Sequence, residues 1–291
     1  MSEESNVFQV NIERNISKNE YYAKLLCGVT PDAFFVLGGG NRKIEKKNGG
    51  KRYTTSPYKG KFYPEKTGGA KARPIAAAEL GEYYPDAKIV TMSHRPSVLF
   101  QLAEQETQAV ESPSFSAVLE SDLHRLKVKN EIIKAPDSTS TLTELMETVL
   151  FAVKHDWHNS AIITNDYQIE RAQKILEILK DDDKRMLLKN QLLFLFASGE
   201  ESGIFESKWG DFEEALHKFK KEEYSVIFVS AEVVLTLRNP HYETLVRILK
   251  EEDGYKNVSE QEKIGNQKID RGEYNFAQPS FREYVLYNHK S

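Results

Sequence analysis

The sequence predicts an α/β protein built on a doubly wound, mainly parallel sheet. Short runs that are apolar throughout are typical of strands buried on both faces. Helical stretches separate these runs, which indicates helical crossovers between parallel strands. The first run is Ala-Phe-Phe-Val-Leu at 33–37, and Gly38, Gly39 and Gly40 follow it directly.

The elements can be assigned in order along the chain. Ser17 and Glu20 have the spacing of a capping box and predict a helix over 17–26. Leu142, Leu145 and Val149 share one face of the most regular helical pattern. The predicted strands are 33–37, 88–92, 131–133, 160–164 and 225–229, and the other predicted helices are 70–84, 97–107, 115–128, 142–155, 169–179, 212–219, 231–237 and 242–251.

The pattern is less regular after residue 182. We therefore predict a core over 1–182, with a basic loop inserted at 41–68, and a C-terminal α/β extension over 183–291 that packs on the core. Residues 192–196 fit a strand or part of a buried helix. The tail from Gly254 is polar, and we expect its late aromatic residues to dock on the body: Phe276, Phe281, Tyr284 and Tyr287.

Composition limits the class of protein. The 291 residues are 40% hydrophobic and 29% charged, which is sufficient for a globular core. A single cysteine excludes a disulfide framework, and we expect Cys27 to be a core thiol. No apolar run approaches a membrane span, and the first residues are acidic and polar, so we expect a cytoplasmic protein without a membrane association.

The net charge of −4 is unevenly distributed. Residues 42–73 contain eleven Lys or Arg and two Glu, a net +9 that leaves −13 for the rest of the chain. This segment fits a solvated, mobile surface loop, or a lid that closes over a phosphate-bearing ligand. A single-stranded nucleic acid is the third alternative, but the acidic body disfavours a long polyanion, so we expect a small anionic partner.

Hydroxyl and charged residues follow two further strands. Residues 138–141 carry four hydroxyl groups. Helix capping explains some of them, and the alternative is that they hold an anion at the start of the helix. At the junction after the predicted strand 160–164, Arg171 lies one helical turn beyond Tyr167. It is a candidate ligand-binding residue, and the alternative is that it forms a surface salt bridge. Turns after forward parallel strands lie at one edge of the sheet, where such sheets bind ligands.

In combination these motifs resemble the YdcF/SanA/ElyC-like family of bacterial proteins. The matching residues are Val36 to Gly40, Arg73 with Ala77, the set Ser138, Thr141 and Glu144, and the set Thr164, Tyr167, Arg171 and Ala172. The resemblance covers about half of the chain and is closest to the soluble YdcF type. It implies a Rossmann-like fold and a nucleotide-type ligand, including S-adenosylmethionine.

The chain departs from this family at two points. Gln168 stands where the family has His, and Ser93-His94-Arg95 replaces a small Gly-rich turn. If the family His performs acid–base chemistry, His94 could replace it, although a lone His at a strand end is more often without a catalytic role.

Two functions remain open from the sequence. The first is a transferase or hydrolase that acts on a nucleotide or nucleotide sugar, and the second is a non-catalytic nucleotide- or S-adenosylmethionine-binding regulatory module. The candidate ligand-binding residues are Gly38, Gly39, Gly40, Arg42, Arg73, Ser138, Thr141, Glu144, Thr164, Asn165, Tyr167 and Arg171, and the candidate catalytic residues are His94, Glu144, Asp166 and Gln168. We expect Gly39, Arg73, Ser138, Thr141, Thr164 and Arg171 to converge on one cleft.

No metal site is expected. His155 and His158 flank Trp157 before a predicted strand, but no carboxylate pair accompanies them in the sequence.

Overall fold

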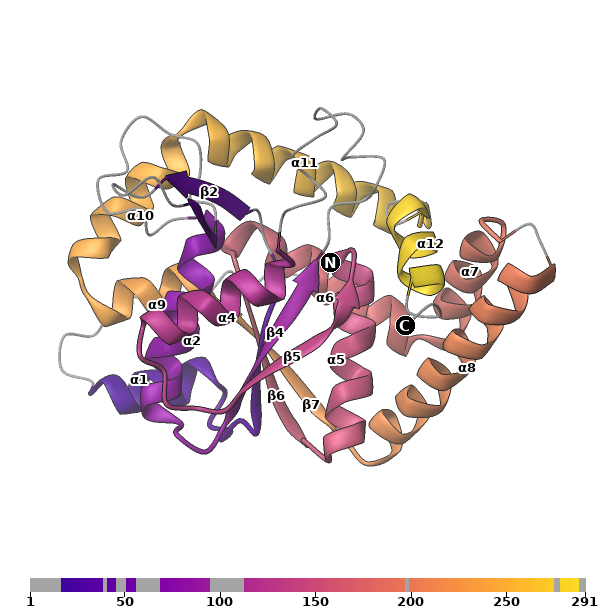
Figure 1. Ribbon diagram of the computed structural model, residues 1–291, viewed down its shortest axis with the longest axis horizontal. Coiled ribbons are helices and arrows are strands. Elements are labelled where there is room, and N and C mark those ends of the chain that lie inside the picture. Colours follow the sequence, from indigo (N-terminus) through magenta and orange to yellow (C-terminus); the bar gives the residue numbers. More distant parts are fainter. Residues whose placement is uncertain are drawn as a thin grey trace, which may run out of the picture.

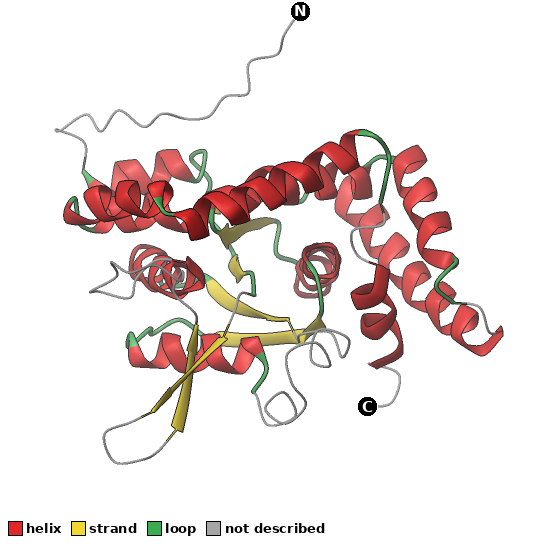
Figure 2. Ribbon diagram, turned by 90° about the horizontal axis from the view of Figure 1, so that it is seen from above, coloured by secondary structure: helices red, strands yellow, loops and turns green. Residues whose placement is uncertain are grey.

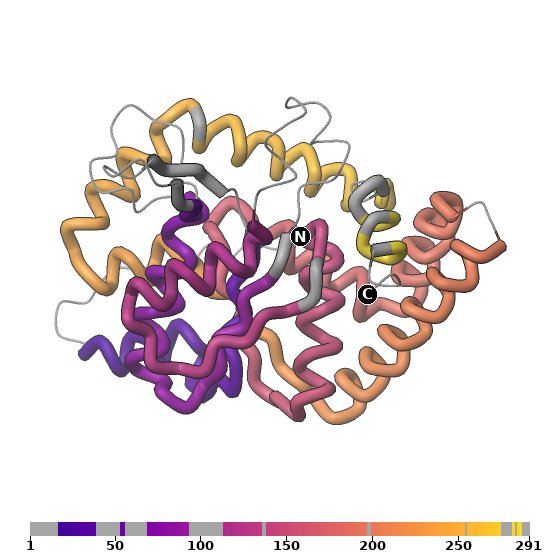
Figure 3. Tube along the Cα trace, in the orientation of Figure 1, coloured from indigo at the N-terminus to yellow at the C-terminus, as the bar shows by residue number. Residues whose placement is uncertain are grey.

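The computed structural model describes residues 17–38, 41–45, 51–55, 69–94, 113–196, 199–274 and 278–287 (Figure 3). The predicted helix 97–107 lies outside these ranges, as do Gly39, Gly40 and Phe276. Among the described helices, none combines the length and the apolar character needed to cross a membrane.

A five-stranded parallel sheet forms the centre of the molecule. Its order is β5-β4-β1-β6-β7, formed by β1 (Ala33–Val36), β4 (Lys88–His94), β5 (Ile132–Ser138), β6 (Asn159–Thr164) and β7 (Ser225–Ser230). Ala33 pairs with Lys88 on one side and with Ser160 on the other, both in parallel register. The predicted central position of residues 33–37 and their parallel pairing with 160–164 are therefore confirmed.

Helices cover both faces of this sheet, which gives a Rossmann-like, doubly wound α/β fold (Figures 1 and 2). Phe34 and Val36 pack toward α1 (Lys18–Leu25), α2 (Ala72–Tyr83), α4 (Phe115–Arg125) and α9 (Ala231–Arg238). Phe35 and Leu37 face the other side, which is covered by α5 (Thr141–His155), α6 (Asp166–Lys180), α7 (Asp182–Leu193) and α8 (Gly199–Lys221). Successive side chains of a strand point to opposite faces, so a strand covered on both faces is apolar throughout.

The segment after residue 182 is mostly helical. It supplies β7, which extends the same sheet, together with α10 (His241–Glu251), α11 (Asp253–Asp270) and α12 (Gln278–Tyr287). The polar tail is thus helical rather than irregular, and Figure 1 shows α11 crossing over α6 on its way to α12. Docking of the late aromatics is confirmed for Phe281 and Tyr284, which are 1% and 3% exposed.

Residues 192–196 are neither a strand nor a continuous buried helix. Helix α7 ends at Leu193, a turn follows, and the Phe194 side chain is 87% exposed. Cys27 was predicted to be a core thiol, which is wrong. It is exposed, beyond the end of α1, in a left-handed conformation with φ 54°.

The basic segment contains regular structure that the sequence did not predict. Strands β2 (Asn41–Glu45) and β3 (Lys51–Thr55) form an antiparallel hairpin, whereas 46–50 and 56–68 lie outside the described residues. The fully buried Asp122 of α4 holds the end of β3, since its carboxylate accepts from the Thr55 N–H at 3.1 Å and from the hydroxyls of Thr54 and Thr55 at 3.0 and 2.7 Å. Lys71, in the short 3₁₀ helix η1 (Gly69–Lys71) before α2, pairs with the same carboxylate at 2.9 Å.

Candidate functional site

The position of the candidate site follows from the order of the strands in the sheet. Strands β4 and β5 lie on one side of β1, and β6 and β7 lie on the other, so the winding of the chain changes direction between β1 and β6. Ligands of doubly wound sheets bind at the carboxyl ends of the two strands that flank such a point. Gly38 follows β1 there, and Thr164 is the last residue of β6. Arg73 lies in the first turn of α2 beside the same point, where it contacts both turns.

Arg73 connects the turn after β1 to the turn after β6. Its side chain is fully buried, its Nη1 donates to the Leu37 carbonyl at 2.9 Å, and the same nitrogen contacts the Gly38 carbonyl. Its Nε donates to Asn165 Oδ1 at 2.7 Å and its Nη2 to Gln168 Oε1 at 2.6 Å. Each of these acceptors is a neutral oxygen.

Glu144 is a buried acidic group in contact with the same turn after β1. It lies on α5, is 3% exposed, and accepts the Gly38 N–H at 2.6 Å. Burial raises the pKa of Glu144 from its ordinary 4.5 to about 7, although the Gly38 N–H and the Arg73 charge act in the opposite direction. A carboxyl group in this range exchanges its proton near neutral pH, as acid–base catalysts do.

A second buried carboxyl group, Glu232, was not among the sequence candidates. It is 2% exposed, lies in the first turn of α9 after β7, and accepts from Asn165 Nδ2 at 2.6 Å and the Asp166 N–H at 3.0 Å. Burial raises its pKa, and the Asp166 carboxylate raises it further. Its position directly after the predicted strand 225–229 is the signal that could have identified it. Asp166 itself contacts the Ser230 hydroxyl and pairs with Lys250.

Gln168 is held in the network by its side-chain oxygen. This atom accepts from Arg73 and also from the Thr164 hydroxyl, the latter at 2.7 Å. Because a side-chain amide does not titrate near neutral pH, Gln168 orients its neighbours and transfers no proton.

Two further candidates on α6 face α11 instead. The ring of Tyr167 meets the ring of Tyr255 edge-on, with 5.7 Å between their centroids. Arg171 Nη1 pairs with both carboxylate oxygens of Glu262 at 3.2 Å. Because α6 begins at Asp166, Arg171 lies in its second turn, where the side chain contacts α11. The two arginines therefore have different partners.

One hydroxyl of the cluster at 138–141, that of Ser140, caps α5. Ser140 is the N-cap, and its hydroxyl accepts the Thr143 N–H at 3.4 Å. Thr143 Oγ1 accepts in return from the N–H groups of Thr139 and Ser140, each at 2.9 Å. Ser138, buried, ends β5, and Thr141 opens α5.

The remaining candidates are located only in part. Gly39 and Gly40 lie outside the described residues, and only the backbone of Arg42, in β2, is described. His94 is the last residue of β4 and pairs in register with Ser138 of β5, at the same edge of the sheet as Gly38.

A pocket with a volume of about 170 Å³ opens beside the network. It lies between the starts of α6 and α9 and the helix α10, and Asp166, Glu232 and Lys250 line it together with Tyr21 of α1. The cavity is thus adjacent to the side of the network that contains Glu232.

Comparison with protein-family models, curated proteins and solved structures gives no match for the chain. The family resemblance of the strand-end motifs therefore stays a prediction.

Proposed function

We propose that the protein binds a phosphate-bearing small molecule, a nucleotide or nucleotide sugar, at the carboxyl ends of β1 and β6, and acts on it as a transferase or hydrolase. In this proposal Arg73 supplies fixed positive charge, Thr164 and Asn165 supply polar contacts, and Glu144 is the acid–base group.

The observation that carries the proposal is the environment of Arg73. Within the described residues its hydrogen-bond acceptors are neutral, and Glu144, a buried carboxyl group that interacts with its charge, is partly protonated near neutral pH. A buried charge without full compensation is costly, and an anion bound at this position would offset that cost. Arginine is well suited to this role because its guanidinium matches the geometry of phosphate oxygens.

The Glu144 carboxylate accepts a hydrogen bond from the backbone N–H to which a phosphate oxygen would bind. It accepts from Gly38 N in the turn after β1, and such turns bind phosphate in doubly wound sheets. A ligand oxygen that replaces the carboxylate at Gly38 frees Glu144 to give or take a proton. Ligand binding should therefore strengthen as the pH falls from 8 to 6, because protonation of Glu144 removes a negative charge next to the phosphate.

A regulatory module without chemistry, binding a nucleotide or S-adenosylmethionine, is the second candidate. Gln168 favours it, because this side chain replaces the histidine expected from the resemblance and its oxygen is engaged by Arg73 and Thr164. In this alternative the ligand binds at the same edge of the sheet. Glu144 takes part in no reaction, and only its protonation depends on the charge of the ligand.

A thermal-shift screen of the full chain tests the proposal, with inorganic phosphate, nucleotides, nucleotide sugars and S-adenosylmethionine as probes. Gln168→Glu places a carboxylate of matching size against Arg73, so the fold should persist while phosphate-bearing probes lose at least about tenfold in affinity. Gln173→Glu is the matched control, because it adds the same charge to the exposed face of the same helix. If no probe binds, or both variants bind as the parent does, the proposal is wrong.

A turnover assay on any ligand found then separates the two candidates. For an enzyme, Glu144→Gln should retain binding and lose most of kcat, since glutamine can accept the Gly38 N–H but carries no acidic proton. A wild-type protein that binds the ligand and converts none of it supports the regulatory module.

A further inference from the structure

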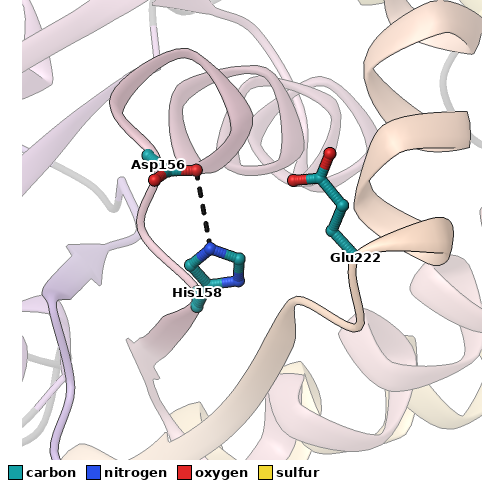
Figure 4. A group of neighbouring side chains, drawn as sticks. All are labelled: Asp156, His158 and Glu222. Atoms are coloured by element: carbon teal, nitrogen blue, oxygen red, sulfur yellow. Dashed lines mark ion pairs between the residues drawn. The ribbon is translucent and has the colours of Figure 1, made fainter.

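Two connections of the chain meet at the opposite, amino-terminal edge of the sheet. The link between α5 and β6 contains Asp156 and His158, and the link between α8 and β7 contains Glu222 (Figure 4). Because β6 and β7 are parallel neighbours, their entry segments lie together, and the Ser225 N–H donates to the His158 carbonyl at 2.7 Å. Three side chains of metal-binding type therefore share one surface site.

Their potential ligand atoms are already close together. One atom from each of Asp156, His158 and Glu222 lies within 4.8 Å of the other two, and Asp156 Oδ1 is 3.5 Å from His158 Nε2. Zinc binds nitrogen and oxygen ligands at about 2.1 Å, so two tetrahedral ligands are about 3.4 Å apart. The Asp156–His158 separation already fits this geometry, and the Glu222 carboxylate would have to move toward them to complete the set.

The neighbouring residues hold these groups in place. Asp156 ends α5 in a left-handed conformation, φ 58° and ψ 40°, which turns the chain between the helix and the strand. The buried Tyr224 donates its hydroxyl to Asp156 at 2.8 Å and contacts Glu222 at 3.4 Å. Its ring stacks on His158, with 4.3 Å between centroids. Tyr224 thus contacts all three groups, as outer residues do around metal ligands.

We propose that Asp156, His158 and Glu222 bind a divalent transition-metal ion of the Zn²⁺ type, with solvent in the remaining coordination position. The imidazole selects such ions over Mg²⁺ and Ca²⁺, which prefer sites made only of oxygen ligands. Lys218 Nζ lies 3.7 Å from the Glu222 carboxylate, and metal binding would break this weak surface ion pair.

Zinc titration of the full, untagged chain tests this site, with isothermal calorimetry and the visible absorption of Co²⁺ as two readouts. His158→Gln removes the nitrogen ligand. Asp156→Asn removes one carboxylate charge and keeps a residue that tolerates the left-handed conformation. His155→Gln is the matched control, because His155 is exposed three residues away and stacks on Trp157 outside the cluster.

We expect one Zn²⁺ per chain with a dissociation constant below about 1 mM. His158→Gln and Asp156→Asn should each weaken binding at least about tenfold and abolish the Co²⁺ band, while His155→Gln changes neither. Binding weaker than this limit overturns the proposal. So does an equal loss in all three variants, no loss in the two cluster variants, or tighter binding of Mg²⁺ or Ca²⁺ than of Zn²⁺.

Discussion

Substitution of the buried Glu144 by glutamine should change how the stability of the protein depends on pH. Burial holds the pKa of this carboxyl at about 7 in the folded protein, against 4.5 when it is exposed. Between these values the folded chain retains a proton that the unfolded chain releases. The contribution of Glu144 to the free energy of unfolding of the wild-type protein therefore falls as the pH rises from about 4.5 to 7, and it levels off above that range.

The size of the effect follows from the same two values. Each pKa unit corresponds to about 1.4 kcal/mol, so burial of this carboxyl group costs about 3 kcal/mol at pH 8, where it is ionised, and less than about 1 kcal/mol at pH 5, where the folded protein keeps it protonated. Glutamine carries no charge to desolvate, and its oxygen can still accept the Gly38 N–H that Glu144 accepts at 2.6 Å. The stability difference between Glu144→Gln and wild type should therefore move in favour of the variant by about 2–3 kcal/mol from pH 5 to pH 8.

Urea unfolding of both chains at pH 5, 6, 7 and 8 measures this difference, because every other titrating group is common to the two proteins. Glu260→Gln serves as the control, since this side chain is 63% exposed and its substitution should change stability by less than about 0.5 kcal/mol at each pH. Parallel curves for wild type and Glu144→Gln would refute the reasoning, as would a variant that becomes relatively less stable as the pH rises.

Four further perturbations test other parts of the structure. Arg73→Lys should lower the free energy of unfolding by about 3 kcal/mol in urea, because a lysine cannot reach the separate acceptors of a buried guanidinium; an unchanged midpoint would contradict this. A double-mutant cycle of Arg171→Ala and Glu262→Ala should give a coupling of about 1 kcal/mol for the contact between α6 and α11, and strict additivity would argue against it. Asp122→Ala should release the β2–β3 hairpin, seen as faster proteolysis within 41–55, and equal digestion of the wild type would count against that anchor. Finally, Cys27 should react fully with a thiol reagent in the folded protein, whereas a thiol that reacts only after denaturation would restore the buried assignment.

The sequence was sufficient to predict an element where the pattern of that element depends only on residues within it or next to it. Residues 33–37 are apolar at every position because the strand is covered on both faces, and this signal predicted its central position. The capping box of Ser17 and Glu20 depends on residues three apart, and it is formed as expected. The β2–β3 hairpin was missed because its anchor, Asp122, lies far along the chain and its basic residues show no apolar alternation.

The sequence by itself determined the α/β class, the order of most strands and helices, and the edge of the sheet at which polar residues would gather. Only the tertiary structure decided which of those residues meet. It placed Arg73 against Asn165 and Gln168, and it paired Arg171 with Glu262 on a helix that the sequence did not predict. It also brought Glu222 beside His158. The physical reason is that hydropathy periodicity and capping are interactions between near neighbours, whereas partners of charged side chains come from segments whose distance depends on how the helices pack.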